Sequence, residues 1–314
     1  MTDMKIYNVV GKRKIFYTVS LIVIAVALVL TFVLGMDVAI EFKGGTIVTY
    51  SYTGTIDEDA VASVARDVTG QNANITLGES LADSLTTVAL SFPASQGLTA
   101  DVQSDLTDAL TTQFADNSLE LYSSQDVNPS TGIGFFGKCM MAVGVSAVAM
   151  IIYIAIRFRN IGGLVAGLCA VVALIHDMCF VYASLVIFRF EINSNFMAVL
   201  LTILGYSINA TIIIYDRIRE NRRIHGDRMT LAELVNLSVS QSVGRSIHTT
   251  VTTVIAMSAI CVVALIAGVE SILSFAFPLV IGLLTGVYSS NCIAPSLWVL
   301  WQNKIDAVKA KKKD

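Results

Sequence analysis

Residues 161–187 read IGGLVAGLCAVVALIHDMCFVYASLVI, an apolar run that contains one Asp and one His near its middle. At the helical rise of about 1.5 Å per residue, this run is long enough to cross a hydrocarbon core of roughly 30 Å. A water-facing surface would not tolerate such a run. The segment therefore predicts a membrane-spanning helix that carries an ionisable pair.

Comparable apolar runs occur on both sides of this segment. Of the 314 residues, 54% are hydrophobic and only 14% are charged, and the mean hydropathy is +0.69. This composition leaves too little polar surface for a soluble globule of the same length. We expect a polytopic α-helical membrane protein whose first helix is a retained anchor, because no A-x-A cleavage site follows Leu34. The six predicted membrane helices are 15–34, 135–156, 161–187, 195–215, 246–268 and 273–299.

The distribution of charge predicts the orientation. With a cytoplasmic N-terminus (1–14), 17 of the 21 Lys and Arg residues lie in cytoplasmic segments, including the basic tail 300–314. Residues 37–128 instead carry fourteen acidic and two basic residues. The positive-inside rule then places both termini in the cytoplasm and residues 37–128 outside the cell membrane, with 135–299 forming a five-helix bundle.

The exported segment alternates between strand-like and helix-like patterns. The helices are expected at 57–68, which ends at Gly70, and at 100–114, which Thr99 precedes as a plausible cap. The order β-α-β-β-α-β predicts an inserted α+β domain of the ferredoxin-like type. Its strands are expected at 46–53, 74–77, 85–92 and 119–124.

Asp177, with His176 beside it, is the clearest candidate for a functional residue inside the membrane. An ionisable group in hydrocarbon costs several kcal/mol and usually faces the bundle interior or a hydrated cavity. The alternative is a structural pair with an Arg or a backbone donor from another helix. We prefer the functional interpretation.

Two polar stripes accompany this pair. They are expected to meet inside the bundle and to line a hydrated path, unless the hydroxyl groups bond back to their own helices. One stripe consists of Thr202, Tyr206 and Asn209, and the other of Arg245, His248, Thr249, Thr252 and Thr253.

The long connection 216–245 contains Thr230 and Glu233 at the spacing of a capping box, so a short interfacial helix is expected there. Its arginines either attract anionic lipid headgroups or only obey the topology rule, and we prefer the second interpretation. Asp216 and Arg217 are expected to form a local ion pair with a structural role.

The glycine pairs Gly163/Gly167 and Gly282/Gly286 either allow close helix packing or reflect the ordinary abundance of small residues in membrane helices. The sequence has no nucleotide fingerprint, catalytic elbow or metal-binding His pair. No enzymatic activity, metal, cofactor or nucleic-acid partner is therefore expected.

Several distinctive motifs follow one another along the chain. The longest is GYSINATIIIYDRIREN (205–221), which begins with Gly205 and Tyr206. The others are EFKGGT (41–46) with Gly44 and Gly45, NPSTG (128–132), IHDM (175–178) and NLSVSQSVGRSIHTTVTT (236–253). Together and in this order, they resemble the SecF family of protein-export membrane proteins.

This resemblance implies a six-helix half bundle of the resistance-nodulation-division (RND) type that pairs with SecD and associates with a SecY-type channel. It further implies that a proton or sodium gradient assists late steps of protein export, and that the exported domain contacts the translocating polypeptide. Membrane lipids are the remaining expected partner. Two other functions stay open: half of an RND-like exporter of lipid or small solutes, and a structural scaffold of the translocon that couples no ion.

The chain departs from the family pattern at one position. The family usually has Asp after the residue that is Asn209 here, whereas this chain has Ala210. The arginine expected to pair with that carboxylate is present as Arg245. Either Asp177 or a SecD carboxylate takes the missing role, or the chain is a natural uncoupled variant, or the substitution was introduced.

Overall fold

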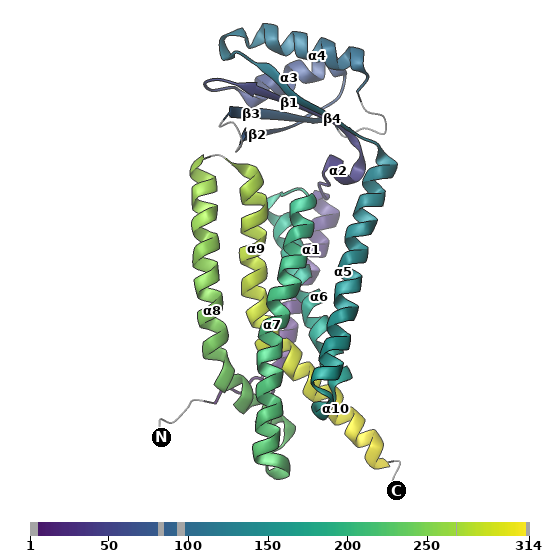
Figure 1. Ribbon diagram of the computed structural model, residues 1–314, viewed down its shortest axis with the longest axis vertical. Helices are drawn as coiled ribbons and strands as arrows, with labels where there is room; N and C mark the ends of the chain where they lie inside the picture. The colour runs from purple at the N-terminus through teal and green to yellow at the C-terminus, as the bar shows by residue number, and fades with distance from the viewer. Residues whose placement is uncertain (1–5, 81–84, 93–97, 268, 312–314) are drawn as a thin grey trace.

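The computed structural model describes residues 6–80, 85–92, 98–267 and 269–311. It consists of a long helical bundle with a small α+β domain at one end (Figure 1). Within the described ranges, six helices are long and apolar enough to span a membrane. The expected polytopic fold is thus confirmed. The helices of the bundle are α1 (Arg13–Leu34), α5 (Pro129–Arg157), α6 (Gly163–Phe188), α7 (Ser194–His225), α8 (Leu231–Ala267), α9 (Glu270–Tyr288) and α10 (Ala294–Lys311). Helices α9 and α10 follow each other within the sixth candidate span, Ser271–Lys309.

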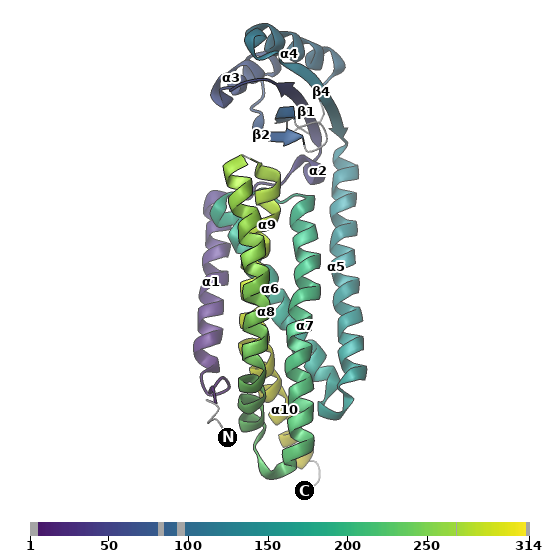
Figure 2. The same ribbon diagram turned by 60° about the vertical axis from the view of Figure 1, so that its left-hand side comes forward.

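The inserted domain has the expected element order. Its sheet has the order β2-β3-β1-β4 with all neighbours antiparallel, as in a ferredoxin-like domain. Helices α3 and α4 cover the face that points away from the bundle (Figures 1 and 2). The elements are β1 (Gly45–Tyr52), α3 (Glu58–Thr69), β2 (Asn74–Ser80), β3 (Leu85–Phe92), α4 (Ala100–Gln113) and β4 (Glu120–Val127).

Local sequence explains where these elements begin and end. The Asp57 side chain accepts a hydrogen bond from the Asp59 amide at the start of α3, and Gly70 ends that helix with φ +70°. Thr99 precedes α4, but its side chain makes no capping hydrogen bond. At the start of α5, Asn128 accepts a hydrogen bond from the Ser130 amide and proline follows at the first helical position.

The domain core lies between the sheet and its two helices. Leu90 of β3 and Leu106 of α4 are fully buried in it. Leu106→Ala should destabilise the domain by about 2–5 kcal/mol, because truncation leaves a cavity that rigid neighbours fill poorly. This loss is measured by thermal unfolding of the full chain in detergent, with the protease sensitivity of residues 37–128 as the readout. Gln113→Ala, at an exposed position of the same helix, should leave the unfolding temperature unchanged, and an equal effect of the two changes would contradict the prediction.

A compact joint connects the domain to the bundle. Arg189, at the end of α6, pairs with Asp37 at 2.9 Å and donates to the Leu34 carbonyl at 2.8 Å. The short helix α2 (Ile40–Lys43) places Glu41 so that it accepts the Ser194 amide at 2.9 Å. Gly44 and Gly45 follow with φ values of +87° and +140°, which L side chains rarely adopt. These two glycines of the EFKGGT motif therefore permit the turn from the joint into β1.

The expected interfacial helix between 216 and 245 is not separate. Helix α7 continues to His225, and the next helix, α8, begins at Leu231 and runs into the bundle without interruption. The capping box is present: the Thr230 amide donates to Glu233 at 2.9 Å and the Glu233 amide donates to the Thr230 hydroxyl at 3.3 Å. Extending a formed helix costs less than nucleating a new one, so the amphipathic segment becomes the first turns of α8.

Candidate functional site

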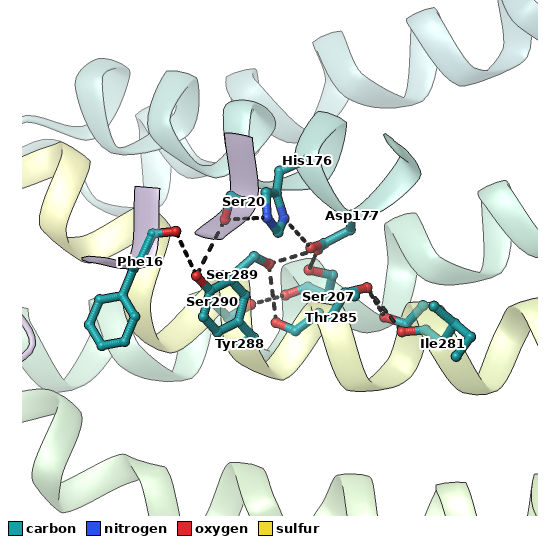
Figure 3. Close-up of polar contacts among 12 residues, drawn as sticks. Phe16, Ser20, His176, Asp177, Ser207, Ile281, Thr285, Tyr288, Ser289 and Ser290 are labelled. Atoms are coloured by element: carbon teal, nitrogen blue, oxygen red, sulfur yellow. Dashed lines mark hydrogen bonds and ion pairs between the residues drawn. The ribbon is translucent and has the colours of Figure 1, made fainter. Parts of the chain in front are cut away.

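Asp177 lies in the middle of α6 and is completely buried in the bundle. Its Oδ2 atom accepts hydrogen bonds from the hydroxyl groups of Ser207 on α7 and Ser289, each at 2.7 Å. Its Oδ1 atom lies 3.1 Å from Nδ1 of His176 (Figure 3). The carboxyl group therefore joins three segments of the bundle, as an ionisable group within a membrane requires.

His176 extends this network toward α1. Its Nε2 atom lies 2.9 Å from the hydroxyl of Ser20, which is 3.3 Å from the hydroxyl of Tyr288. Tyr288 in turn donates to the Phe16 carbonyl at 2.8 Å (Figure 3). These contacts form a chain of hydrogen-bonding groups from α1 to the Asp177 carboxyl. The two hydroxyls can both donate and accept, the His176 ring has one nitrogen for each role when neutral, and the Phe16 carbonyl only accepts.

A π-helical turn, η4 (Ser289–Ile293), lies between α9 and α10 and supplies part of the site. Ser289 at its start donates to Asp177, while Ser290 donates to the Ser207 carbonyl at 3.1 Å and lies 2.9 Å from the Thr211 hydroxyl. The wider turn lets two consecutive serines point into the bundle. Turns of this kind occur frequently at functional sites.

The serine partners of Asp177 were absent from the sequence prediction. Ser207 lies within the GYSINATIIIYDRIREN motif, and the Ser289–Ser290 pair interrupts an apolar run, so both carry a weak signal. Ser20 carries none, because a single serine in a membrane helix ordinarily bonds to its own backbone.

Among the described residues, one side-chain hydrogen bond joins the first polar stripe to α8, and it does not reach the second stripe. The hydroxyl of Tyr206 lies 2.8 Å from the hydroxyl of Thr250, a residue outside the predicted stripe. Thr202 donates to its own helix, to the Ala198 carbonyl. The expected buried hydrated path between these stripes is therefore wrong for the chain alone, since Thr202, Asn209, Arg245, His248, Thr249 and Thr252 are exposed on the outer surface.

Arg245 and Ala210 lie at nearly the same level of the bundle. Helices α7 and α8 are consecutive and antiparallel, and the Tyr206–Thr250 contact sets their register. Ala210 lies four residues after Tyr206 on α7, and Ser246 lies four residues before Thr250 on α8. Ala210 is therefore level with Ser246, the neighbour of Arg245 in the sequence. Ala210 is 8% exposed. Among the described residues, the Arg245 guanidinium has no acidic partner.

Asp216 and Arg217 do not pair with each other, contrary to expectation. Asp216 pairs with Arg219 at 2.6 Å and with Arg157 at 3.2 Å, whereas Arg217 pairs with Glu220 at 2.6 Å. Adjacent residues project about 100° apart around a helix, whereas residues three apart are neighbours on its surface. The i,i+3 partners therefore replace the adjacent one.

Comparison with known proteins identifies relatives over nearly the full length. The family model described as protein export membrane protein SecD/SecF, C-terminal, matches residues 107–304. Protein translocase subunit SecF of Acidaminococcus fermentans is 33% identical over 303 residues, which cover 96% of this chain and 99% of that protein. Protein translocase subunit SecDF of Bacillus subtilis is 31% identical over 310 residues, covering 96% of this chain and 39% of that protein.

The fold is also similar to a solved structure. The crystal structure of SecDF, a translocon-associated membrane protein from Thermus thermophilus, matches 95% of this chain with a TM-score of 0.76 and 27% identity. The chain spans 39% of each of these two SecDF proteins. The RND-type half bundle with an inserted ferredoxin-like domain is thus confirmed, and the chain belongs to the SecD/SecF family of protein-export membrane proteins.

Proposed function

We propose that this chain is a SecF-type translocase subunit that pairs with a SecD-type chain and couples a proton or sodium gradient to late steps of protein export across the cytoplasmic membrane. The observation that carries the proposal is the exposed Arg245 on the outer face of α8. A cation within the membrane needs a partner, and the described part of the chain supplies no carboxylate to it. A neighbouring subunit with an acidic group on its own helix would satisfy it.

The depth of Arg245 supports this argument. Tyr206, close to the midpoint of the predicted helix 195–215, contacts Thr250. Five residues along α8 correspond to roughly 7.5 Å, so Arg245 lies within a hydrocarbon core of roughly 30 Å and not in the cytoplasmic connection 216–245, where the sequence predicted it. Asn209 and His248 are exposed near the same level. We place the SecD-type chain on the surface formed by Asn209, Arg245 and His248.

The relatives that continue beyond the matched region support the same arrangement. In the proteins named SecDF, the segment similar to this chain covers 39% of the length. We infer that the remainder supplies within one chain the neighbour that a separate SecD-type subunit provides here. The same proposal places the basic end of the bundle in the cytoplasm. Residues 37–128 would then lie outside, where they meet a translocating polypeptide emerging from a SecY-type channel.

Ala210→Asp is the most direct test of the coupling. A carboxylate at this level of α7 would face Ser246, one position along α8 from Arg245, and the attraction between the two charges would favour an acid–base pair near the subunit surface. We expect this variant to raise gradient-dependent export of a secreted reporter in a strain that lacks SecF. Export is measured with and without an uncoupler, and both proteins are confirmed in the membrane by immunoblotting.

Other results would change the proposal in defined ways. Equal export by both versions with no response to the gradient would support a scaffold that couples no ion. Purification as a homo-oligomer, with no SecD-type subunit retained, would favour half of a lipid or solute exporter. Failure of both inserted proteins to support export would argue against the translocase role.

A further inference from the structure

A cavity of about 570 Å³ opens at the end of the bundle opposite the sheet. It lies between the corner that joins α5 to α6 and the last turns of α7. These parts of the helices are toward the bottom of Figure 1. Its volume is within the range of small-ligand sites. The residues that line it are Asn160, Ile161, Asp216, Arg219, Glu220, Arg222 and Arg223.

The two acids in the wall are already neutralised. Asp216 is held by both Arg219 and Arg157, and Glu220 pairs with Arg217. The guanidinium groups of Arg157 and Arg219 also lie 5.4 Å and 5.7 Å from the centre of the Phe158 ring, which stabilises their positions.

Two arginines of the wall remain without acidic partners among the described residues. These are Arg222, which is partly buried, and Arg223, which is exposed. The cavity therefore presents an excess of positive charge next to the amide of Asn160. Arginine is well suited to phosphate because its planar group donates two parallel hydrogen bonds.

An exposed apolar surface adjoins this charged cavity. Ile156, which is 71% exposed, directly precedes Arg157 at the end of α5, and Leu164, which is 60% exposed, is the second residue of α6, just after the corner. Both lie within about one helical turn of the wall. A ligand with a phosphate group and hydrocarbon chains would use both surfaces, whereas free phosphate would use only the first.

We propose that this cavity binds the phosphate headgroup of an anionic phospholipid, with Arg222 and Arg223 contacting the phosphate and the acyl chains lying on the outer surface of α5 and α6. The tendency of basic residues to remain on one side of a membrane accounts for the number of arginines. This tendency does not explain why the acids that line the cavity are paired while Arg222 and Arg223 have no acidic partner among the described residues.

The test uses the full chain, purified in a neutral detergent and titrated with phosphatidylglycerol while its unfolding temperature and bound lipid mass are followed. The double variant Arg222→Gln/Arg223→Gln should bind phosphatidylglycerol roughly 25-fold more weakly, which corresponds to a factor of about five for each arginine. The matched control is Arg228→Gln/Lys304→Gln, which removes the same charge at exposed positions outside the cavity. It should change the affinity less than twofold.

Two further probes separate the headgroup from its alternatives. Phosphatidylcholine, which has no net charge, should bind the original chain weakly and with no difference between the two double variants. Inorganic phosphate at the same concentration should not displace phosphatidylglycerol, because it gains nothing from the apolar surface. Equal lipid binding by the two double variants, or efficient displacement by inorganic phosphate, would overturn the proposal.

Discussion

Asp177→Asn is expected to abolish the gradient-dependent part of protein export while the bundle remains folded. Asn has nearly the same shape, and its amide can still bond to the surrounding groups of Ser207, Ser289 and His176. It cannot, however, exchange a proton or carry a negative charge. We therefore expect the same loss in the original chain and in the Ala210→Asp background, measured with the secreted reporter in the strain lacking SecF.

Asp177→Ala distinguishes this role from a structural one. Alanine leaves the Ser207 hydroxyl and Nδ1 of His176 without the partner that Asp177 provides in a buried site, at a cost of about 1–3 kcal/mol for each unsatisfied group. This variant should lose both thermal stability and export, whereas Asp306→Asn, at an exposed position of α10, should lose neither. If Asp177→Asn exports normally and only the alanine variant fails, the acid is structural.

Gly163→Ala is expected to have the largest effect on stability. A Cβ atom at this position would overlap the carbonyl oxygen of Ala155 and would lie 2.9 Å from the carbonyl carbon of Phe158. Both obstacles are backbone atoms, so the corner between α5 and α6 must shift. We expect a loss of about 3 kcal/mol, which should lower the apparent unfolding temperature in detergent by roughly 5 °C or more.

A second glycine, Gly144 of α5, provides the control. Gly144 is exposed and has no atom within 4 Å of the point where an alanine methyl group would lie, so Gly144→Ala should leave the protein as stable or slightly more stable. Gly282 makes a different contact, because its Cβ would overlap the side chain of Ile203. Gly282→Ala should therefore regain stability when combined with Ile203→Ala. An unfolding temperature for Gly163→Ala equal to that of Gly144→Ala would refute the packing argument.

Local sequence patterns accounted for the secondary structure and the fold class. Apolar runs long enough to cross a bilayer predict helices because backbone polar groups in lipid must be satisfied within the segment. Strand alternation and the element order predicted the inserted domain, because apolar residues recur every second residue along a half-buried strand and about every 3.6 residues along an amphipathic helix. Asp177 was recognisable for the same reason, as one acid in an apolar run. The start of α8 was not, because the amphipathic segment expected as a separate interfacial helix instead extends α8, which costs less than nucleating a new helix.

The partners of each polar residue depended on contacts between distant segments. Asp177 meets Ser289, 112 positions away, and His176 meets Ser20, 156 positions away. Such pairings follow from the register of packed helices, and a slip of one residue rotates a side chain by about 100°. For that reason the Tyr206 hydroxyl contacts the Thr250 hydroxyl, whereas Arg245 lies on the outer surface of the bundle. The sequence was sufficient to predict which polar side chains are energetically unfavourable in a membrane. The packing of the helices determined which of them have partners within the described part of the chain and which require a neighbouring subunit.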